Sequence, residues 1–352
     1  MEIFMKEIEK IDKNFKVVED VGEEITFVNC LTEPIRVYGL LSTEEGFARM
    51  PEKTARDISE GVAFLCHHTA GGRVRFRTDS PAIAIRAKMS DIGKMPHFAL
   101  TGSAGFDLYE GGCYRGTFVP PFAIEDGYTS TIGLPGGRKM REITIHMPLY
   151  SGVKSLEIGL QAGAVIERAR DYAIQDPVVY YGSSITQGGC ASRPGNCYEN
   201  IISRELDCDH VNLGFSGSAL GEERMAEYIE GIKMSAFVYD YDHNAPDVAH
   251  LKKTHERMFE IIRRSHPTLP VVMVTRPQPN PNEKEQERRA VIMETYQSAL
   301  NAGDKNVFFI DGSAMLHMFG GDCGTVDGCH PNDLGFQCMA KAIGAVLKNI
   351  LE

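Results

Sequence analysis

The sequence predicts an α/β protein in two parts: a flavodoxin-like three-layer domain with a parallel sheet, preceded by a β-sandwich of the jelly-roll type. From about residue 24 to residue 167, short β-rich pieces are separated by turn residues. After residue 177, strand-like runs alternate with amphipathic segments of helix length. The length of 352 residues also exceeds what one hydrophobic core usually serves. We therefore expect an accessory domain at 1–172 and a second domain at 173–352.

The N-terminal half contains six segments with strand composition, at residues 25–30, 35–41, 74–78, 82–87, 117–119 and 143–147. Between residues 73 and 78, arginine alternates with apolar or small residues, which predicts a strand with one face in solvent. The turn Asp-Ser-Pro at 79–81 follows, and it suggests a hairpin or a meander with the next strand. Many short strands and few helical repeats favour the jelly-roll sandwich.

Two further stretches of this half are of interest. Gly-Phe-Asp-Leu-Tyr at 105–109 has, on chemistry alone, the composition of a turn followed by an edge strand. The loop-like Lys-Met-Pro-His at 94–97 could reach a neighbouring site, although a lone histidine such as His97 is more often a surface or core residue than a catalyst. This half could bind a ligand, or it could brace the other half and form a wall of its cleft.

The C-terminal half contains five expected strands, at residues 178–181, 211–215, 237–241, 271–275 and 307–310. Helices are expected between them at about 198–206 and 221–230, around 251–262 and at 283–300. A last helix places apolar residues from 336 to 350 along one face. Five strands with intervening helices predict the flavodoxin-like domain, with right-handed crossovers.

Composition narrows the range of partners. A net charge of −11 and a pI near 5.5 give no general attraction to nucleic acids or anionic membranes, so we expect neither as a partner. The N-terminus lacks an apolar signal region, and no stretch looks long and apolar enough to span a bilayer. The nine cysteines form no Cys-x-x-Cys pair, which favours reduced thiols and a cytoplasmic location. The oligomeric state stays open, and a homo-oligomer is compatible with the sequence.

In a doubly wound sheet, the residues that follow the strands share one edge, where ligands bind. Ser184 follows the first strand, and Asp327 precedes His330 by three residues in a loop before the last helix. An aspartate so placed can accept the imidazole Nδ1–H and leave Nε2 to face a hydroxyl, as a serine nucleophile requires. The alternative is that Ser183, Ser184 and Thr186 only cap the next helix.

Acyl transfer also needs hydrogen-bond donors for the developing oxyanion. The backbone N–H groups of Ser184 and Gly217 and the side-chain amide of Asn244 stand after the first three strands, where such donors belong. Arg276, after the fourth strand, could contact a polar substrate or form a surface salt bridge. His243 could line the same wall or have a structural role.

These pieces resemble the sequence blocks of the SGNH (GDSL-type) hydrolases. Gly-Ser-Ser-Ile-Thr-Gln-Gly at 182–188 is similar to the first block, and Asn-Leu-Gly-Phe-Ser-Gly at 212–217 to the second. Asn244 matches the asparagine of the third block, and Asp-Gly-Cys-His-Pro at 327–331 the fifth. Ser183 replaces the usual aspartate of the first block, and the sequence at 240–244 departs from the usual Gly-x-Asn-Asp. Residues 105–109 resemble the motif of a β-sandwich that precedes one subgroup of these hydrolases.

The resemblance implies that 173–352 is the catalytic domain, with Ser184 as nucleophile, His330 as base and Asp327 as its orienter. Ser184, Gly217 and Asn244 would form the oxyanion hole. We expect a serine esterase that removes small acyl groups, above all acetyl, from a polar substrate such as a carbohydrate.

Two alternatives stay open: an acyltransferase that uses the same residues, and a non-catalytic carbohydrate-binding protein. The substrate would be a small-molecule or oligosaccharide ester. We expect no cofactor and no metal, because the histidines are dispersed without ligand spacing.

Overall fold

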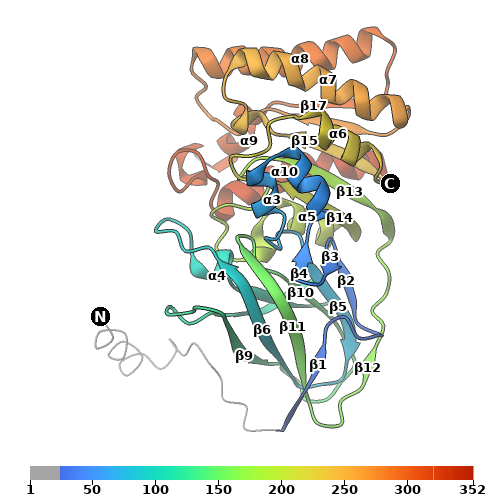
Figure 1. The fold of residues 1–352 in the computed structure, drawn as a ribbon, viewed down its shortest axis with the longest axis vertical. Coiled ribbons are helices and arrows are strands. Elements are labelled where there is room, and N and C mark those ends of the chain that lie inside the picture. The colour runs from blue at the N-terminus through green and yellow to red at the C-terminus, as the bar shows by residue number, and fades with distance from the viewer. Residues whose placement is uncertain (1–23, 320, 352) are drawn as a thin grey trace.

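The structure is a computed structural model that describes residues 24–319 and 321–351. The N-terminal segment in which the sequence shows no signal region lies outside the described residues. Figure 1 shows a β-rich lower part and an upper part in which helices surround a sheet.

The lower part is a β-sandwich, as predicted. Its first sheet has the strand order β1-β11-β6-β9, with β1 at Ile25–Asn29, β11 at Ser151–Gln161, β6 at Ala82–Ile92 and β9 at Gly127–Gly133. The second has the order β12-β5-β10-β7-β8, with β12 at Ile166–Glu167, β5 at Arg73–Thr78, β10 at Arg141–His146, β7 at Phe106–Glu110 and β8 at Cys113–Phe118. Apolar side chains from both sheets fill the space between them.

Smaller elements complete this part of the chain. Strand β2 (Arg36–Tyr38) pairs with β5, and β3 (Leu41–Thr43) pairs with β4 (Gly46–Ala48). Three short helices, which the sequence analysis did not predict, are α2 (Glu52–Ile58), α3 (Glu60–Leu65) and α4 (Leu100–Ser103).

The upper part is the predicted flavodoxin-like domain. Its parallel sheet has the order β14-β13-β15-β16-β17, in which the domain's first strand, β13, lies between its second and third, β14 and β15. The strands are β13 (Ile174–Gly182), β14 (Cys208–Gly214), β15 (Ala236–Asp240), β16 (Val271–Val274) and β17 (Val307–Ile310).

Helices cover both faces of this sheet (Figure 1). One face packs against α6 (Glu223–Glu230), α7 (Val248–Ser265) and α8 (Glu283–Asn301), and the other against α5 (Tyr198–Leu206) and α10 (Asp333–Leu351). Consecutive residues of β13 alternate between the two cores: Val179 and Tyr181 join the first, and Val178 and Tyr180 the second. A short helix α9 (Gly312–Met315) and the 3₁₀ turns η1 (Pro194–Asn196), η2 (Asp242–Asn244), η3 (Leu316–Phe319) and η4 (Gly321–Gly324) connect the rest.

Two expectations about β5 are wrong. The turn at 79–81 joins no hairpin, because β5 and β6 belong to different sheets of the sandwich and the turn carries the chain from one to the other. The arginine face of β5 does not face solvent over most of its length either: Arg73 is fully buried and Arg75 is 6% exposed, and only the Arg77 side chain, at 38%, is partly open. Arg73 pairs with Asp209 of the upper part, so this face is covered by the second domain.

The expectation that no segment could span a bilayer also needs correction. Helix α10 has 19 residues and a mean hydropathy of 1.2, which meets the length and composition of a membrane span. Its apolar residues Phe336, Met339 and Ile343 are fully buried in the core against the parallel sheet. The apolar composition of α10 therefore serves this packing.

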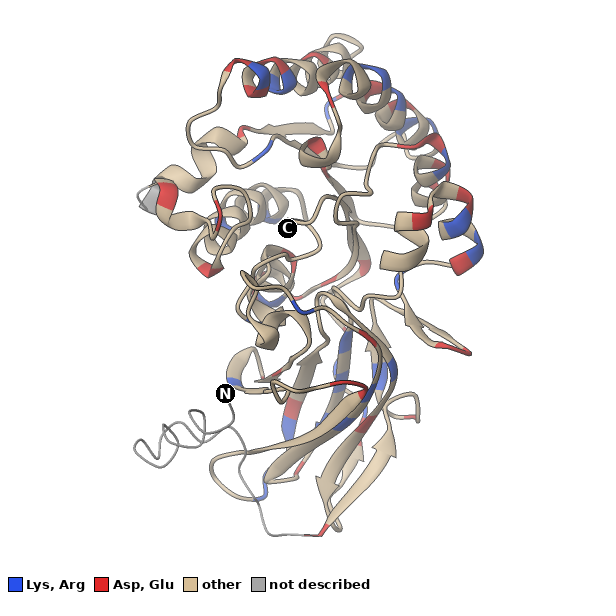
Figure 2. Ribbon diagram, turned by 60° about the vertical axis from the view of Figure 1, so that its left-hand side comes forward, with Lys and Arg blue, Asp and Glu red and all other residues tan. Residues whose placement is uncertain are grey.

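Basic and acidic residues are interspersed along the helices at the top of Figure 2. Several form exposed ion pairs, such as Arg257 with Glu223 at 3.0 Å. Exposed pairs of this kind add little to stability, about 0–1 kcal/mol each.

Candidate active site

Ser184 lies in the turn after β13, the strand between β14 and β15 in the parallel sheet. A Cβ at Gly182 would collide with the Thr186 hydroxyl and with the carbonyl of Asp240, so a glycine is required where the chain leaves the strand. The Ser183 hydroxyl accepts a hydrogen bond from the N–H of Ile185 at 3.1 Å. This local bond occupies Ser183 and leaves the Ser184 hydroxyl to face the site.

The structure brings Ser184, His330 and Asp327 together. Ser184 Oγ lies 3.0 Å from His330 Nε2, and His330 Nδ1 lies 2.8 Å from Asp327 Oδ2. Both distances are within hydrogen-bond reach, and each ring nitrogen has one partner. A neutral imidazole that donates from Nδ1 to the carboxylate presents its Nε2 lone pair to the serine hydroxyl.

The Asp327 carboxylate is held by its own loop. Its Oδ1 accepts the backbone N–H groups of Cys329 (3.0 Å) and His330 (2.8 Å). Burial acts to raise the pKa of Asp327, but the hydrogen bonds from the His330 ring and from these two amides outweigh it and lower the pKa to about 2. Asp327 is therefore a fixed negative charge beside the imidazole at any ordinary pH.

The three candidate oxyanion donors follow β13, β14 and β15, which are neighbouring strands of the parallel sheet. Within the described chain, neither the N–H of Ser184 nor that of Gly217 has a protein hydrogen-bond partner. Gly217 has φ +68°, a left-handed conformation that favours glycine. The Asn244 amide donates one hydrogen to the carbonyl of Phe215 at 2.8 Å, and its second hydrogen remains available.

The two residues expected to contact substrate both have protein neighbours. Arg276 forms an ion pair with Glu285 at 3.1 Å, with 21% of its side chain exposed. His243 Nδ1 lies 3.7 Å from the sulfur of Cys329. Burial, with a further contribution from the Arg276 guanidinium, lowers the pKa of His243 well below its usual value. Both side chains thus have protein neighbours, and their contact with substrate stays a prediction.

Two residues that the sequence analysis did not single out hold the turn that carries Ser184. The Tyr150 hydroxyl donates to the carbonyl of Ser184 at 3.1 Å. The Gln187 amide donates to the carbonyl of Leu149 at 3.2 Å, and its oxygen accepts the N–H of Ser216 at 3.0 Å. Gln187 stands inside the 182–188 block and could have been noticed there, whereas nothing in the sequence marks Tyr150.

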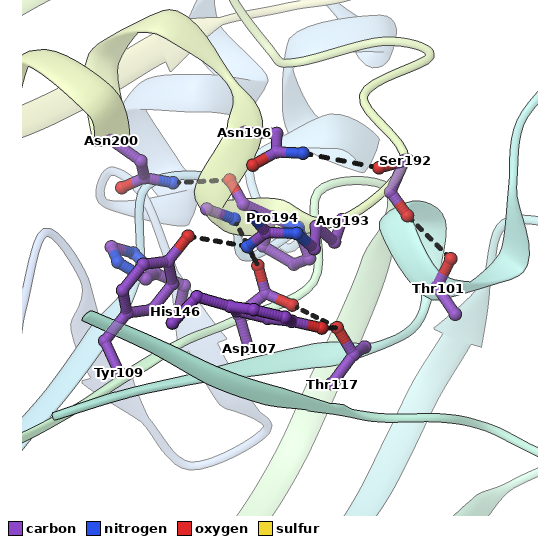
Figure 3. A network of polar contacts seen from close by, with 12 residues as sticks. Thr101, Asp107, Tyr109, Thr117, His146, Ser192, Arg193, Pro194, Asn196 and Asn200 are labelled. Atoms are coloured by element: carbon purple, nitrogen blue, oxygen red, sulfur yellow. Dashed lines mark hydrogen bonds and ion pairs between the residues drawn. The ribbon is translucent and has the colours of Figure 1, made fainter. Parts of the chain in front are cut away.

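The Gly-Phe-Asp-Leu-Tyr motif forms a contact between the two parts of the chain (Figure 3). Its Asp107 is fully buried, and the carboxylate accepts hydrogen bonds from Arg193 (3.0 Å), the N–H of Gly195 (2.8 Å) and Thr117 (2.8 Å). The Tyr109 hydroxyl accepts a second bond from Arg193 at 2.6 Å. The expectation of an edge strand is wrong, because β7 pairs with β10 on one side and with β8 on the other. The β7 side chains also fix the segment around η1.

The segment around η1 is also connected to the loop that carries His330. The hydroxyl of Thr101 donates to the carbonyl of Ser192 at 2.6 Å (Figure 3). The N–H of Ser192 donates to the carboxylate of Asp333 at 2.8 Å, and Asp333 is the first residue of α10, directly after the loop that carries His330. The β-sandwich thus contacts the segment after Ser184, which in turn is bonded to the start of α10 after the His330 loop.

One group near the site has the residue types of metal ligands. His97, Cys190 and His330 each offer one ligand atom, and these atoms all lie within 4.8 Å of one another. His330 is also the hydrogen-bond partner of Ser184, so the group adjoins the Ser184–His330 pair.

Comparison with known proteins agrees with this geometry. The profile of the GDSL-like lipase/acylhydrolase family matches residues 175–348, and that of the GxDLY N-terminus of SGNH-hydrolase-type esterases matches residues 25–166. A search of curated protein sequences found no match.

Solved structures share the whole architecture. A candidate GDSL-like lipase from Bacteroides ovatus is 29% identical, with a TM-score of 0.83 over 93% of this chain and 98% of that one. A salicylyl-acyltransferase from a tetracycline biosynthetic pathway is 19% identical, with a TM-score of 0.76 over the same shares. An acetyl xylan esterase from the rumen bacterium Butyrivibrio proteoclasticus is 12% identical, with a TM-score of 0.60 over 93% of this chain and 98% of that one. The chain belongs to the SGNH (GDSL-type) hydrolase family, in the two-domain subgroup whose N-terminal β-sandwich carries the Gly-x-Asp-Leu-Tyr motif.

Proposed function

We propose that this protein is a serine esterase that removes small acyl groups, above all acetyl, from a polar substrate such as a carbohydrate. The observation that carries the proposal is the hydrogen-bonded chain from Ser184 Oγ to His330 Nε2 (3.0 Å) and from His330 Nδ1 to Asp327 (2.8 Å). This is the arrangement of nucleophile, base and orienter by which serine hydrolases activate a hydroxyl.

The reaction follows from these positions. His330 Nε2 takes the proton of Ser184 as Oγ attacks the ester carbonyl carbon. The oxygen that becomes negative is stabilised by the free N–H groups of Ser184 and Gly217 and by the Asn244 amide. The tetrahedral intermediate collapses, the C–O bond to the alcohol breaks, and the alcohol leaves with the proton from His330. In the second half-reaction, His330 takes a proton from water as the water oxygen attacks the acyl carbon. The bond to Ser184 Oγ then breaks, the acid leaves, and His330 returns the proton to Oγ.

A polar substrate is favoured by the similarity of this fold to those of two carbohydrate esterases. The acetyl xylan esterase of Butyrivibrio proteoclasticus and a family two carbohydrate esterase from Clostridium thermocellum, solved with cellohexaose, have the same two-domain architecture. At 12% and 16% identity these similarities establish the fold alone. The carbohydrate substrate is therefore our proposal for this chain.

The first test removes the nucleophile and the base. Ser184→Ala and His330→Ala should each lower the turnover of p-nitrophenyl acetate by at least about a thousandfold, because losing a triad member costs orders of magnitude. Ser183→Ala is the matched control, since the Ser183 hydroxyl is bonded to the turn and should cost less than about tenfold. Residual activity in Ser184→Ala above roughly a tenth of wild type would exclude the assignment, provided that circular dichroism shows a folded protein.

The substrate class needs its own experiment. Acetylated oligosaccharides and simple acyl esters would be incubated with wild type and with Ser184→Ala, and the products followed by mass spectrometry. We expect loss of acetyl groups from the oligosaccharides with wild type only. Turnover restricted to aryl or lipid-like esters would reject a carbohydrate substrate and leave the esterase mechanism intact.

Acyl transfer to an acceptor other than water is the second candidate. It is favoured by the similarity of the whole chain to the salicylyl-acyltransferase, whose TM-score of 0.76 exceeds those of the carbohydrate esterases named above. The same acyl-serine would form, and an alcohol would replace water in the second step. Alcohol acceptors added to the assay should then yield transferred ester at the expense of free acid, whereas a pure hydrolase gives free acid throughout.

A further inference from the structure

His97, Cys190 and His330 come from three separate segments of the chain. His97 lies in the loop after β6 of the sandwich, Cys190 closes the nucleophile turn, and His330 follows in the loop before α10. One ligand atom from each lies within 4.8 Å of the others, and the two imidazole ring centres are 6.0 Å apart. Two imidazoles and a thiol are the side chains that bind Zn²⁺ and related borderline-soft ions.

These side chains have lone pairs to offer. Across the described residues, neither the His97 ring nor the Cys190 sulfur has a hydrogen-bond partner. In His330, Nδ1 is bonded to Asp327, so the nitrogen left for a metal is Nε2, the one that faces Ser184. A carboxylate that holds the far nitrogen of a ligating histidine is the usual second partner of a metal-bound imidazole.

Cys190 has a backbone conformation that is unfavourable for a residue with a side chain. Cys190 has φ +75°, a left-handed conformation that residues with a Cβ rarely adopt. Two backbone hydrogen bonds hold this turn. The N–H of Gly189 donates to the carbonyl of Ser184 (2.8 Å), and the N–H of Ala191 donates to the carbonyl of Gly188 (3.2 Å). A Cβ at Gly189 would lie 3.4 Å from the His330 ring, so the turn rests directly on that imidazole.

We propose that His97, Cys190 and His330 form a reversible binding site for Zn²⁺ or a divalent ion of similar softness, and that occupancy of this site switches the esterase off. The inhibition rests on the proposed function, in which His330 Nε2 is the base. The metal and Ser184 compete for the same nitrogen lone pair, so a bound ion leaves Ser184 without a base. One ligand comes from the sandwich and two from the catalytic domain.

Binding needs only modest rearrangement. Tetrahedral Zn²⁺ at 2.0–2.3 Å from its ligands holds those atoms roughly 3.3–3.8 Å apart. The ligand atoms now lie up to 4.8 Å apart and must approach one another on binding. Most of this movement can come from His97, whose exposed side chain is able to rotate. Burial raises the pKa of the Cys190 thiol to about 12, so without metal the sulfur is protonated. Binding replaces that S–H bond with a metal–thiolate bond and releases the proton to water, while a water completes the fourth position.

The binding test does not depend on esterase activity. Full-length protein would be titrated with Co²⁺, whose thiolate charge-transfer band in the near ultraviolet and visible d–d bands report a tetrahedral site with sulfur. We expect one equivalent bound in wild type, bands of equal or greater strength in Ser184→Ala, and loss of the charge-transfer band in Cys190→Ser. Absence of the bands in wild type would overturn the site, whatever the fate of the proposed esterase.

The second arm measures inhibition. Zn²⁺ at buffered micromolar levels should lower the turnover of p-nitrophenyl acetate by at least tenfold, with recovery on adding EDTA, and Mg²⁺ should have no effect because it prefers oxygen ligands. His97→Ala and Cys190→Ser should each weaken inhibition by tenfold or more, relative to their own metal-free rates. Cys113→Ser and His317→Ala, which change exposed residues elsewhere, are the matched controls. Equal inhibition in all four variants would place the metal at another site and overturn the proposal.

Discussion

At the residue scale, the site geometry predicts a specific role for Asp327. Its carboxylate accepts the Nδ1–H of His330 and so keeps the neutral imidazole in the tautomer that faces Ser184. Asp327→Asn keeps the shape but can donate to Nδ1 instead, which stabilises the wrong tautomer. We expect kcat to fall by about 10³–10⁴ with little change in KM, measured on p-nitrophenyl acetate. Loss of less than tenfold would show that His330 works without an orienting carboxylate.

The pH dependence belongs to the same residues. The pKa of Asp327 is lowered to about 2, so this carboxylate stays ionised throughout the usual assay range. Histidine side chains in general change protonation between about pH 5 and pH 8, and a general base works only in its neutral form. We expect kcat/KM to fall as the pH is lowered through this range, and a flat profile would contradict the base.

Stability follows a different pH window. A carboxyl whose pKa is lower in the folded than in the unfolded protein stabilises the fold above its unfolded pKa, near 4, and loses that contribution as pH falls towards the folded pKa. The Asp327 contribution should therefore be complete above about pH 5 and vanish towards pH 2. The difference in unfolding free energy between wild type and Asp327→Asn, measured against pH, should shrink only in that acid range.

At the scale of elements, the sequence allowed the parallel sheet to be predicted closely and the sandwich only in part. Strands β15, β16 and β17 and residues 178–181 of β13 are largely continuous apolar runs, so both their places and the residues after them follow from local pattern. Ser184 could be found for that reason. The arginines of β5 could not be placed, because alternating charge looks the same whether it faces water or a partner such as Asp209. Contacts that depend on the docking of two domains, such as Tyr150 on the Ser184 carbonyl, leave no local signal.

The segment around η1 gives a prediction at this scale. Asp107→Ala would remove the acceptor of Arg193 and of the Gly195 N–H at a buried contact, and breaking a buried pair from one side costs about 3–5 kcal/mol. We expect the unfolding free energy in urea to drop by about 3 kcal/mol, because Arg193 keeps some exposure and its bond to Tyr109. Glu157→Ala, which breaks the exposed pair with Arg86, should cost less than about 1 kcal/mol. Similar losses in the two variants would mean that the motif does not fasten the domains.

At the scale of the whole molecule, the two halves share one interior. Residues Met50, Val62 and Leu65 of the N-terminal half are buried in the same core as α6 and the parallel sheet, and Figure 1 shows α3 among the helices of the upper part. Arg49 reaches further, with its guanidinium 4.5 Å from the ring centre of Phe215 and bonded to the carbonyl of Gly214. The N-terminal half therefore contributes directly to the core beneath the sheet that carries Ser184.

This shared core predicts that the catalytic half cannot stand alone. A fragment of residues 173–352 would expose the apolar surface that Met50, Val62 and Leu65 cover, at about 1.5–3 kcal/mol for each large side chain. It would also remove Arg73, the ion-pair partner of the partly exposed Asp209. Such losses approach the 5–15 kcal/mol that stabilises a typical protein. We expect the full chain to unfold in one transition, and the fragment to show a Tm lower by more than 10 °C or no cooperative transition in calorimetry. A fragment that melts cooperatively at the full-length Tm would refute the shared core.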